Sequence, residues 1–512
     1  MADDDRPWES RAQRLARRLG RALAGPPVAS SYWLVRELFV RWVGGVYFVA
    51  FASAAMQLPG LIGERGLLPV GRFLAAFAEH TESAPFVALP TIFWIDHSDP
   101  FMVGVCVVGA VLALAVVAGF GHVLVLFVLW ALYLSIDHVG QRWYAFGWES
   151  QLLETGFLAL FLAATRSVRT LDARAAPSIV PIVLGRWLVV RIMIGAGLIK
   201  LRGDPCWTEL TCLQYHFETQ PIPSPGGWLM HHFPGWMLAG GVLFNHIAEL
   251  GAPIFAFGPR RMRHVAGLVL VAFQLTLIVS GNLSFLNWIT IAPCILLFDD
   301  ALLRRVCPRH WRARVDAMPV GARPPPEQRI GGGAYAVLVT WLSLPIVVNL
   351  ASPGQAMNRT YDRLSLVNTY GAFGSVGDHR LELVIEGTLD AVPSDDADWR
   401  AYELPCKPGD PRRRPCQITP WHDRLDWLMW FAALEVEYSG GGLQREAWVL
   451  ALLDALLRGE PAVLALVDRD PFAGTPPRFV RVTVWRYEFT DLGEEGWWRR
   501  QPLGVLVRPV AK

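Results

Sequence analysis

The chain has 512 residues, of which 53% are hydrophobic and only 18% are charged. Soluble domains carry about 25% charged residues, so this composition excludes an ordinary soluble protein and favours a membrane domain. The formal net charge of +2 gives no electrostatic reason to expect nucleic acid as a partner. Lysine occurs only at Lys200, Lys407 and Lys512, and arginine supplies the other basic residues. That bias is typical of GC-rich bacterial genomes.

Residues 1–31 are polar and basic and are expected to form a tail. The stretch 32–352 is expected to be a transmembrane helical domain, because it contains apolar segments long enough to cross a bilayer. Nine segments fit this description, near 33–57, 101–119, 121–138, 148–165, 180–199, 236–257, 264–280, 284–299 and 332–351.

Arginine is concentrated in the N-terminal tail and in the loops 166–174, 260–263 and 304–329. Cytoplasmic loops of membrane proteins carry an excess of arginine and lysine. With nine spans, all four basic regions fall on the cytoplasmic side. The sequence therefore predicts a cytoplasmic N-terminus, and it places loops 58–100 and 201–235 outside with the C-terminal region.

Residues 353–512 are expected to form an extracytoplasmic α+β domain with a small sheet or sandwich, because apolar spans give way here to β-branched, aromatic and polar stretches. Strands are predicted at 367–373, 380–387, 399–404, 479–489 and 497–507, and helices at 423–434, 443–457 and 461–468. The length of about 150 residues is typical of a single domain.

The seven cysteines divide in a way that agrees with this orientation. Two close pairs lie in the predicted outer regions, where the compartment oxidises thiols, and the others lie in spans or in a cytoplasmic loop. We predict disulfides within the pairs; reduced thiols or a metal site are the alternatives, although neither spacing matches a zinc site. The pairs are Cys206 with Cys212 and Cys406 with Cys416, and the remaining cysteines are Cys106, Cys294 and Cys307.

His246 and Glu249 lie within one predicted span and share a helix face at i,i+3 spacing. Polar groups in a membrane are costly, so both should face the bundle interior and meet polar groups from the 200–216 region. Together with Lys200 and His216 they are the candidates for catalysis. The alternative is a structural pair that holds helices together. No metal site and no cofactor are expected.

Residues 197–225 join two apolar segments and are rich in proline, cysteine and charge. Candidate binding residues there are Arg202, Asp204, Trp207 and Glu218. The alternative is a rigid lid that only plugs the helical bundle.

Between Cys406 and Cys416, the residues Arg412, Arg413 and Arg414 form a basic loop that would dock an acidic partner or lipid headgroups, unless it is a solvated turn. Trp421, Trp427 and Trp430 follow, and they are expected to rest this domain on the membrane.

Four sequence blocks resemble the lipase maturation factor family, which consists of polytopic membrane proteins that help lipases fold in the secretory pathway. The blocks lie at 202–221, with Arg-Gly-Asp-Pro-Cys-Trp and His-Phe-Glu-Thr-Gln-Pro, at 280–288, at 406–416 and at 424–433. The resemblance implies a membrane-anchored helper without a catalytic step, whose C-terminal domain engages a client lipase or another exported protein. Its partners would be that client and membrane lipids.

A second hypothesis is a membrane enzyme acting on a lipid-like or exported protein substrate, loosely similar in layout to vitamin K-dependent carboxylases. An enzyme needs a pocket in which several candidate groups converge, whereas a helper needs an exposed outer surface. The expected location is the bacterial inner membrane, or the endoplasmic reticulum membrane for a eukaryotic source.

Overall fold

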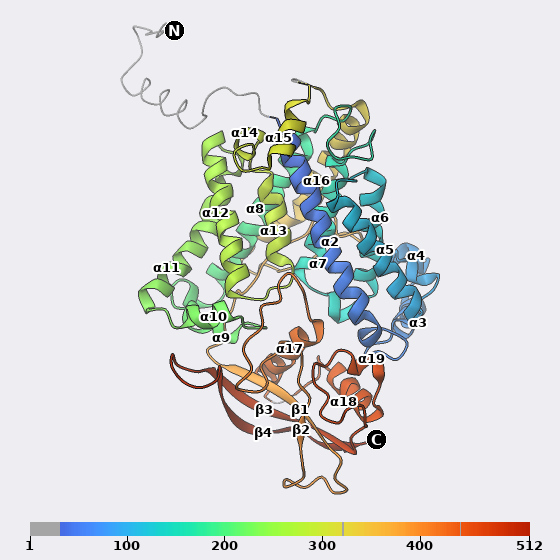
Figure 1. The fold of residues 1–512 in the computed structure, drawn as a ribbon, viewed down its shortest axis with the longest axis vertical. Coiled ribbons are helices and arrows are strands. Elements are labelled where there is room, and N and C mark those ends of the chain that lie inside the picture. Colours follow the sequence, from blue (N-terminus) through green and yellow to red (C-terminus); the bar gives the residue numbers. More distant parts are fainter. Residues whose placement is uncertain (1–30, 320–321, 441) are drawn as a thin grey trace.

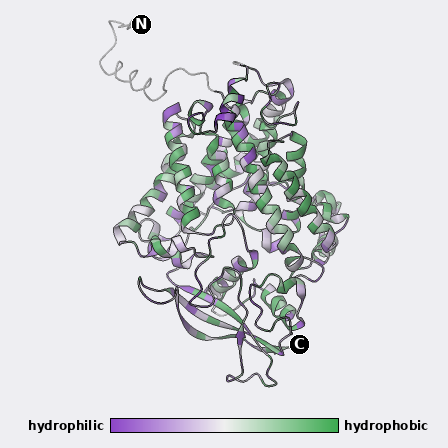
Figure 2. Ribbon diagram, viewed as in Figure 1, coloured by the Kyte–Doolittle hydropathy of each residue, from purple (hydrophilic) through white to green (hydrophobic). Residues whose placement is uncertain are grey.

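The structure is a computed structural model that describes residues 31–319, 322–440 and 442–512. A bundle of helices forms one part, and a small sheet with three helices lies at one end of the bundle (Figure 1). The expected tail at 1–31 lies outside the described residues except for Ser31. The helices of the bundle are predominantly apolar along their length, as a membrane domain requires (Figure 2).

Six helical segments in the described part of the chain are long and apolar enough to cross a membrane. The central one is α2, and the segment at Gly235–Phe257 joins α11 to a π-helical and a 3-10 turn. The segments are α2 (Trp33–Leu61), α5 (Asp99–Val117), α8 (Ile179–Arg202), Gly235–Phe257 with α11 (Gly235–His246), α12 (Arg260–Ser280) and α16 (Pro326–Ala351).

The predicted number of nine spans is not confirmed. Helices do form at the other three places, but α6 (Val123–Val139) has 17 residues, α7 (Gly147–Leu162) has 16 and α13 (Leu286–Ile295) has 10. About 20 residues are needed to span a bilayer. All three helices are shorter than this, and α13 ends two residues after Pro293.

Shorter helices lie at the two ends of the bundle. At the end that carries the sheet, α9 and α10 follow α8 in the chain, while α14 and α15 lie at the opposite end (Figure 1). Their bounds, with those of the two helices after α2, are α3 (Val70–His80), α4 (Pro85–Ala88), α9 (Leu213–Thr219), α10 (Pro225–His231), α14 (Asp300–Leu303) and α15 (Arg309–Asp316).

The C-terminal part contains one antiparallel sheet with the strand order β2-β1-β3-β4. Strands β1 (Arg380–Thr388), β3 (Phe479–Phe489) and β4 (Trp498–Ala511) confirm three of the five predictions, and β2 is reduced to Arg400–Ala401. The predicted strand at 367–373 is wrong. This segment lies against the helical bundle, where the backbone N–H of Asn368 and the hydroxyl of Tyr370 donate to the carboxylate of Glu154.

Three helices complete this part: α17 (Arg424–Ser439), α18 (Trp448–Arg458) and α19 (Pro461–Leu464). Leu452 and Leu456 of α18 are buried in one apolar core with Leu383 of β1 and Val482 of β3. The period of the leucines in α18 therefore gives the buried face that an amphipathic helix needs to pack on a sheet.

Candidate functional site

The loop after α8 carries the first family-like block, and it is attached to the C-terminal part. Asp204 donates its backbone N–H to the carbonyl of Gly374 at 2.9 Å and accepts from the N–H of Cys206 at 3.0 Å. The indole of Trp207 donates to the carbonyl of Phe373 at 2.9 Å. A disulfide joins Cys206 to Cys212 across 4.8 Å between their Cα atoms. Asp204 and Trp207, two candidate binding residues, therefore hold two segments of this chain together.

Lys200 and Glu249 form a buried ion pair, with 2.5 Å between Nζ and Oε1. Asn245 bonds to both, because its Oδ1 lies 3.1 Å from Nζ and its Nδ2 donates to Oε2 of Glu249 at 3.0 Å. The ammonium also lies 5.0 Å from the centre of the Trp207 ring. Each buried charge of the pair is therefore compensated by an opposite charge and by the side chain of Asn245, as burial of an ion pair requires.

His246 takes a partner of its own, since its Nε2 lies 2.9 Å from the carbonyl oxygen of Trp207. His246 and Glu249 therefore both meet polar groups of the 200–216 region, but each has a different partner. The helix becomes π-helical at Ile247–Gly251. Lys200 is bonded by Glu249 and by Asn245, not by His246. The expected contact of Glu249 with a polar group from the 200–216 region is present, through Lys200.

His216 is buried and lies edge-on to the ring of Phe373, with 4.9 Å between the ring centres. Burial, with a contribution from the charge of Lys200, lowers the pKa of His216 to about 4, so the ring is neutral. It lines a pocket of about 30 Å³ together with His379, Trp430 and Glu437. A water needs about 10–15 Å³ of such space, so the pocket is far smaller than a lipid-like substrate.

The remaining candidates in this loop also contact the C-terminal part. Arg202 donates to the side chain of Gln355 at 2.7 Å and to the carbonyl of Leu350 at 2.8 Å. Glu218 accepts the backbone N–H of Phe489 at 2.6 Å, and burial raises the pKa of its carboxyl group. The loop is thus closer to the predicted rigid lid than to an open binding surface.

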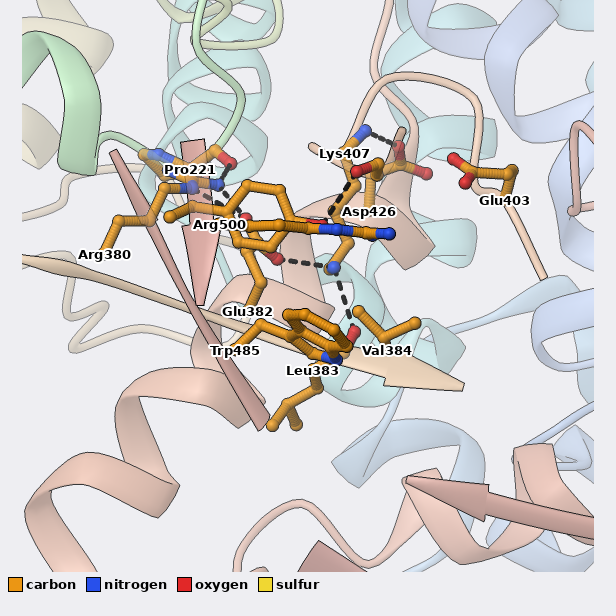
Figure 3. Close-up of polar contacts among 12 residues, drawn as sticks. Pro221, Arg380, Glu382, Leu383, Val384, Glu403, Lys407, Asp426, Trp485 and Arg500 are labelled. Carbon is orange, nitrogen blue, oxygen red and sulfur yellow. Dashed lines mark hydrogen bonds and ion pairs between the residues drawn. The ribbon is translucent and has the colours of Figure 1, made fainter. Parts of the chain in front are cut away.

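A buried cluster of charged side chains at β1 binds the end of this loop (Figure 3). Arg380 donates to the carbonyls of Gln220 and Pro221 at 2.5 and 3.0 Å, and to Oε1 of Glu382 at 2.7 Å. Lys407 supplies the second cation, 2.5 Å from Oε2 of Glu382. Sequence reasoning missed Arg380, since one arginine at a strand start is unremarkable. Lys407 could have been singled out from the sequence, because it is one of only three lysines in the chain.

The basic loop of the third block is closed by the disulfide between Cys406 and Cys416, whose Cα atoms lie 5.5 Å apart. Arg413 turns inward and donates to the carbonyls of Leu404, at 2.8 Å, and Lys407. Arg412 and Arg414 are exposed. The arrangement places two of the three predicted binding arginines on the surface and uses the third to hold the loop.

The fourth block inserts an arginine into the helical bundle. Arg424 is fully buried, lies 2.7 Å from the carboxylate of Glu149 on α7, and stacks 3.5 Å from the ring centre of Tyr144. Gln57 of α2 bonds to the same segment, accepting the N–H of Arg424 at 2.9 Å and donating to the carbonyl of His422 at 2.7 Å.

The expectation that the tryptophans of this region rest on the membrane is wrong for two of them. Trp427 is buried against Trp148 of α7, with 4.9 Å between the ring centres. Trp430 donates its indole N–H to the carbonyl of Thr219 at 2.9 Å. Both lie between the two parts of the chain because α17 begins at the bundle itself (Figure 1).

Among the described residues, no group of three histidine, cysteine or acidic side chains is placed to hold a metal ion. The candidate residues come together in two places: Lys200 with Glu249, His246 and Trp207, and Glu218 with the sheet. In both places the carboxylates, the ammonium group and Nε2 of His246 bond within the protein, while Nδ1 of His246 has no hydrogen-bond partner among the described residues.

Comparisons with known proteins agree with the four sequence blocks. The family model described as "Lipase maturation factor transmembrane domain" matches residues 34–305, and "Lipase maturation factor C-terminal domain" matches 366–508. The chain is 43% identical to "Lipase maturation factor 1" of Bos taurus, over 96% of this chain and 92% of that protein. It is 42% identical to "Lipase maturation factor 1" of Homo sapiens, over 96% and 91%.

"Lipase maturation factor 2" of Homo sapiens is 30% identical over 91% of this chain and 81% of that protein. These relatives come from animals, so they give no support to the bacterial source that the arginine bias suggested. No solved structure matches the chain.

Proposed function

Because the chain belongs to the lipase maturation factor family, we propose that it is a membrane-anchored helper in the maturation of lipases or other exported proteins. The names of its relatives support this role. The observation that carries the proposal is the use of the candidate residues: Lys200, Glu249 and Glu218 all bond within the protein. Groups that are satisfied in this way suit a scaffold better than the membrane enzyme of the second hypothesis.

The same contacts suggest a separate role for each of the two domains. We propose a transmembrane domain at 32–352 that holds an extracytoplasmic domain at 353–512 in a fixed position, with Arg380 and Arg424 as the main connections. Residues that were expected to bind a client, such as Asp204 and Trp207, then act as supports.

The client surface is proposed to lie on the far side of the C-terminal domain. Strand β4 is the last strand of the sheet, and Leu503 and Val505 are 53% and 49% exposed there. Exposed apolar side chains on an edge strand are typical of sites that meet another chain. Arg412 and Arg414 offer exposed positive charge on the same domain.

The basic connections at the opposite end of the bundle support an orientation with that end in the cytoplasm. The C-terminal domain would then face the lumen of the endoplasmic reticulum or, for a bacterial chain, the periplasm. A reporter fused after Lys512 tests this orientation, and activity of the reporter only in the cytoplasm would contradict it.

The function is tested in cells that lack their own lipase maturation factors. Expression of the chain together with a secreted lipase should raise the activity of the lipase in the medium at equal lipase synthesis. The control is a chain ending at Ala351, which retains the helical bundle and lacks the C-terminal domain. If the full chain and the control give the same lipase activity, the proposed function is wrong.

A further inference from the structure

The end of the bundle opposite the sheet is strongly basic. It is formed by three connections and by α14 and α15, and polar segments gather there (Figures 1 and 2). Contacts join the connections: Arg166 pairs with Glu327 at 2.6 Å and Arg260 pairs with Asp299 at 2.5 Å. The basic residues are Arg166, Arg169, Arg174, Arg260, Arg261, Arg263, Arg304, Arg305, Arg309, Arg312, Arg314, Arg323 and Arg329.

The carboxylates of this end are fewer than its arginines. Three of them pair with arginines near the surface, Asp172 with Arg174, Asp316 with Arg304 and Glu327 with Arg166. Asp299 and Asp300 are both buried. Asp300 accepts hydrogen bonds from the backbone N–H groups of Trp33 and Leu34 at the start of α2, at 2.8 and 2.9 Å. Asp299 forms an ion pair with the guanidinium of Arg260. These carboxylates are used for helix capping and internal pairing, so the outer surface of this end is positively charged.

Exposed apolar side chains alternate with the arginines. Val306 is 79% exposed and follows the exposed Arg305, and Val168 is 61% exposed and precedes the exposed Arg169. Ile330 is 75% exposed and follows Arg329. Arginine beside exposed apolar residues is the composition of segments that lie on anionic membranes, where the charge meets headgroups and the apolar group enters the boundary of the acyl chains.

We propose that this basic end binds anionic phospholipid headgroups of the leaflet in which it lies, with Arg305, Val306 and Arg309 as its central residues. Two features favour a lipid surface over a soluble polyanion. The patch continues directly into the apolar helices α12 and α16, which are themselves candidate spans. A soluble polyanion would also leave Val306 and Ile330 in water, whereas a lipid surface removes them from it.

The experiment uses the full chain in nanodiscs of phosphatidylcholine with and without phosphatidylglycerol. Native mass spectrometry then counts the lipids that stay bound to the protein. The wild type should retain phosphatidylglycerol in preference to phosphatidylcholine. The variant Arg305→Gln/Arg309→Gln should lose roughly tenfold or more of that preference, since each arginine near an anionic surface contributes about 1 kcal/mol. Val306→Ser should lower retention of the lipid to a smaller extent.

The matched control is Arg445→Gln/Arg478→Gln, which removes two exposed arginines from the C-terminal domain and should keep the wild-type preference. Equal retention of both lipids by the wild type, or an equal loss in the control, overturns the proposal. A parallel titration uses inorganic phosphate. If phosphate protects the wild type from heat as well as the anionic lipid does, and through the same two arginines, the site is a general anion site and the lipid proposal is wrong.

Discussion

The ion pair between Arg424 and Glu149 gives the sharpest test of how the two parts are held together. Both side chains are fully buried, and the guanidinium of Arg424 lies 2.7 Å from the carboxylate of Glu149. Removing one partner of a buried pair typically costs about 3–5 kcal/mol, because the other charge stays buried without compensation. Arg424→Met keeps the bulk of the side chain and removes the charge, so it should destabilise the protein by about that amount.

The assay is thermal unfolding of the purified protein in detergent, followed by tryptophan fluorescence. The control Arg458→Met removes an exposed arginine that pairs with Asp454 four residues earlier, and it should change stability by only about 0.5 kcal/mol. The double variant Arg424→Met/Glu149→Gln should recover part of the loss, because no buried charge remains. Equal unfolding temperatures for Arg424→Met and Arg458→Met would refute this reasoning.

Four other predictions follow from single contacts. Burial raises the pKa of Asp426 to about 7, above the value near 4 of an unfolded chain. The native state therefore binds a proton that the unfolded state has lost, and the stability of the protein should fall as pH rises from about 4 to 7. Asp426→Asn should flatten this dependence when unfolding is measured against pH, and an unchanged slope contradicts the prediction. Lys200→Met should cost about 3–5 kcal/mol and Lys200→Met/Glu249→Leu less, measured by thermal unfolding; equal losses would show that the charges are not coupled. His246→Ala should cost about 1–3 kcal/mol, and its folded fraction should still support lipase activity; an inactive folded fraction would favour catalysis. Non-reducing peptide mapping should find both disulfides, and replacement of Cys406 and Cys416 by serine should cost roughly 2–3 kcal/mol in thermal unfolding; recovery of all four cysteines as free thiols contradicts the pairing.

Local patterns were sufficient for features that depend on neighbouring residues. The composition and the apolar runs identified a membrane-type helical region followed by an α+β region. The β-branched and aromatic residues of 479–489 gave the bounds of β3. The close spacing of the cysteines suggested the pairs that the structure contains. Each of these features is set by the backbone and by side chains within a few residues of one another.

The roles of the charged residues were decided by the tertiary structure. Arg380 donates hydrogen bonds to carbonyl groups that lie 159 and 160 residues away in the chain. Arg424 pairs with Glu149, which precedes it by 275 residues (424 − 149). No local pattern contains that information, because a buried arginine and an exposed one look the same in a sequence. The sequence by itself therefore determined most of the helices and three of the strands, because these depend on neighbouring residues. The pairing of buried charges, which joins residues far apart in the chain, decided how the two parts are held together.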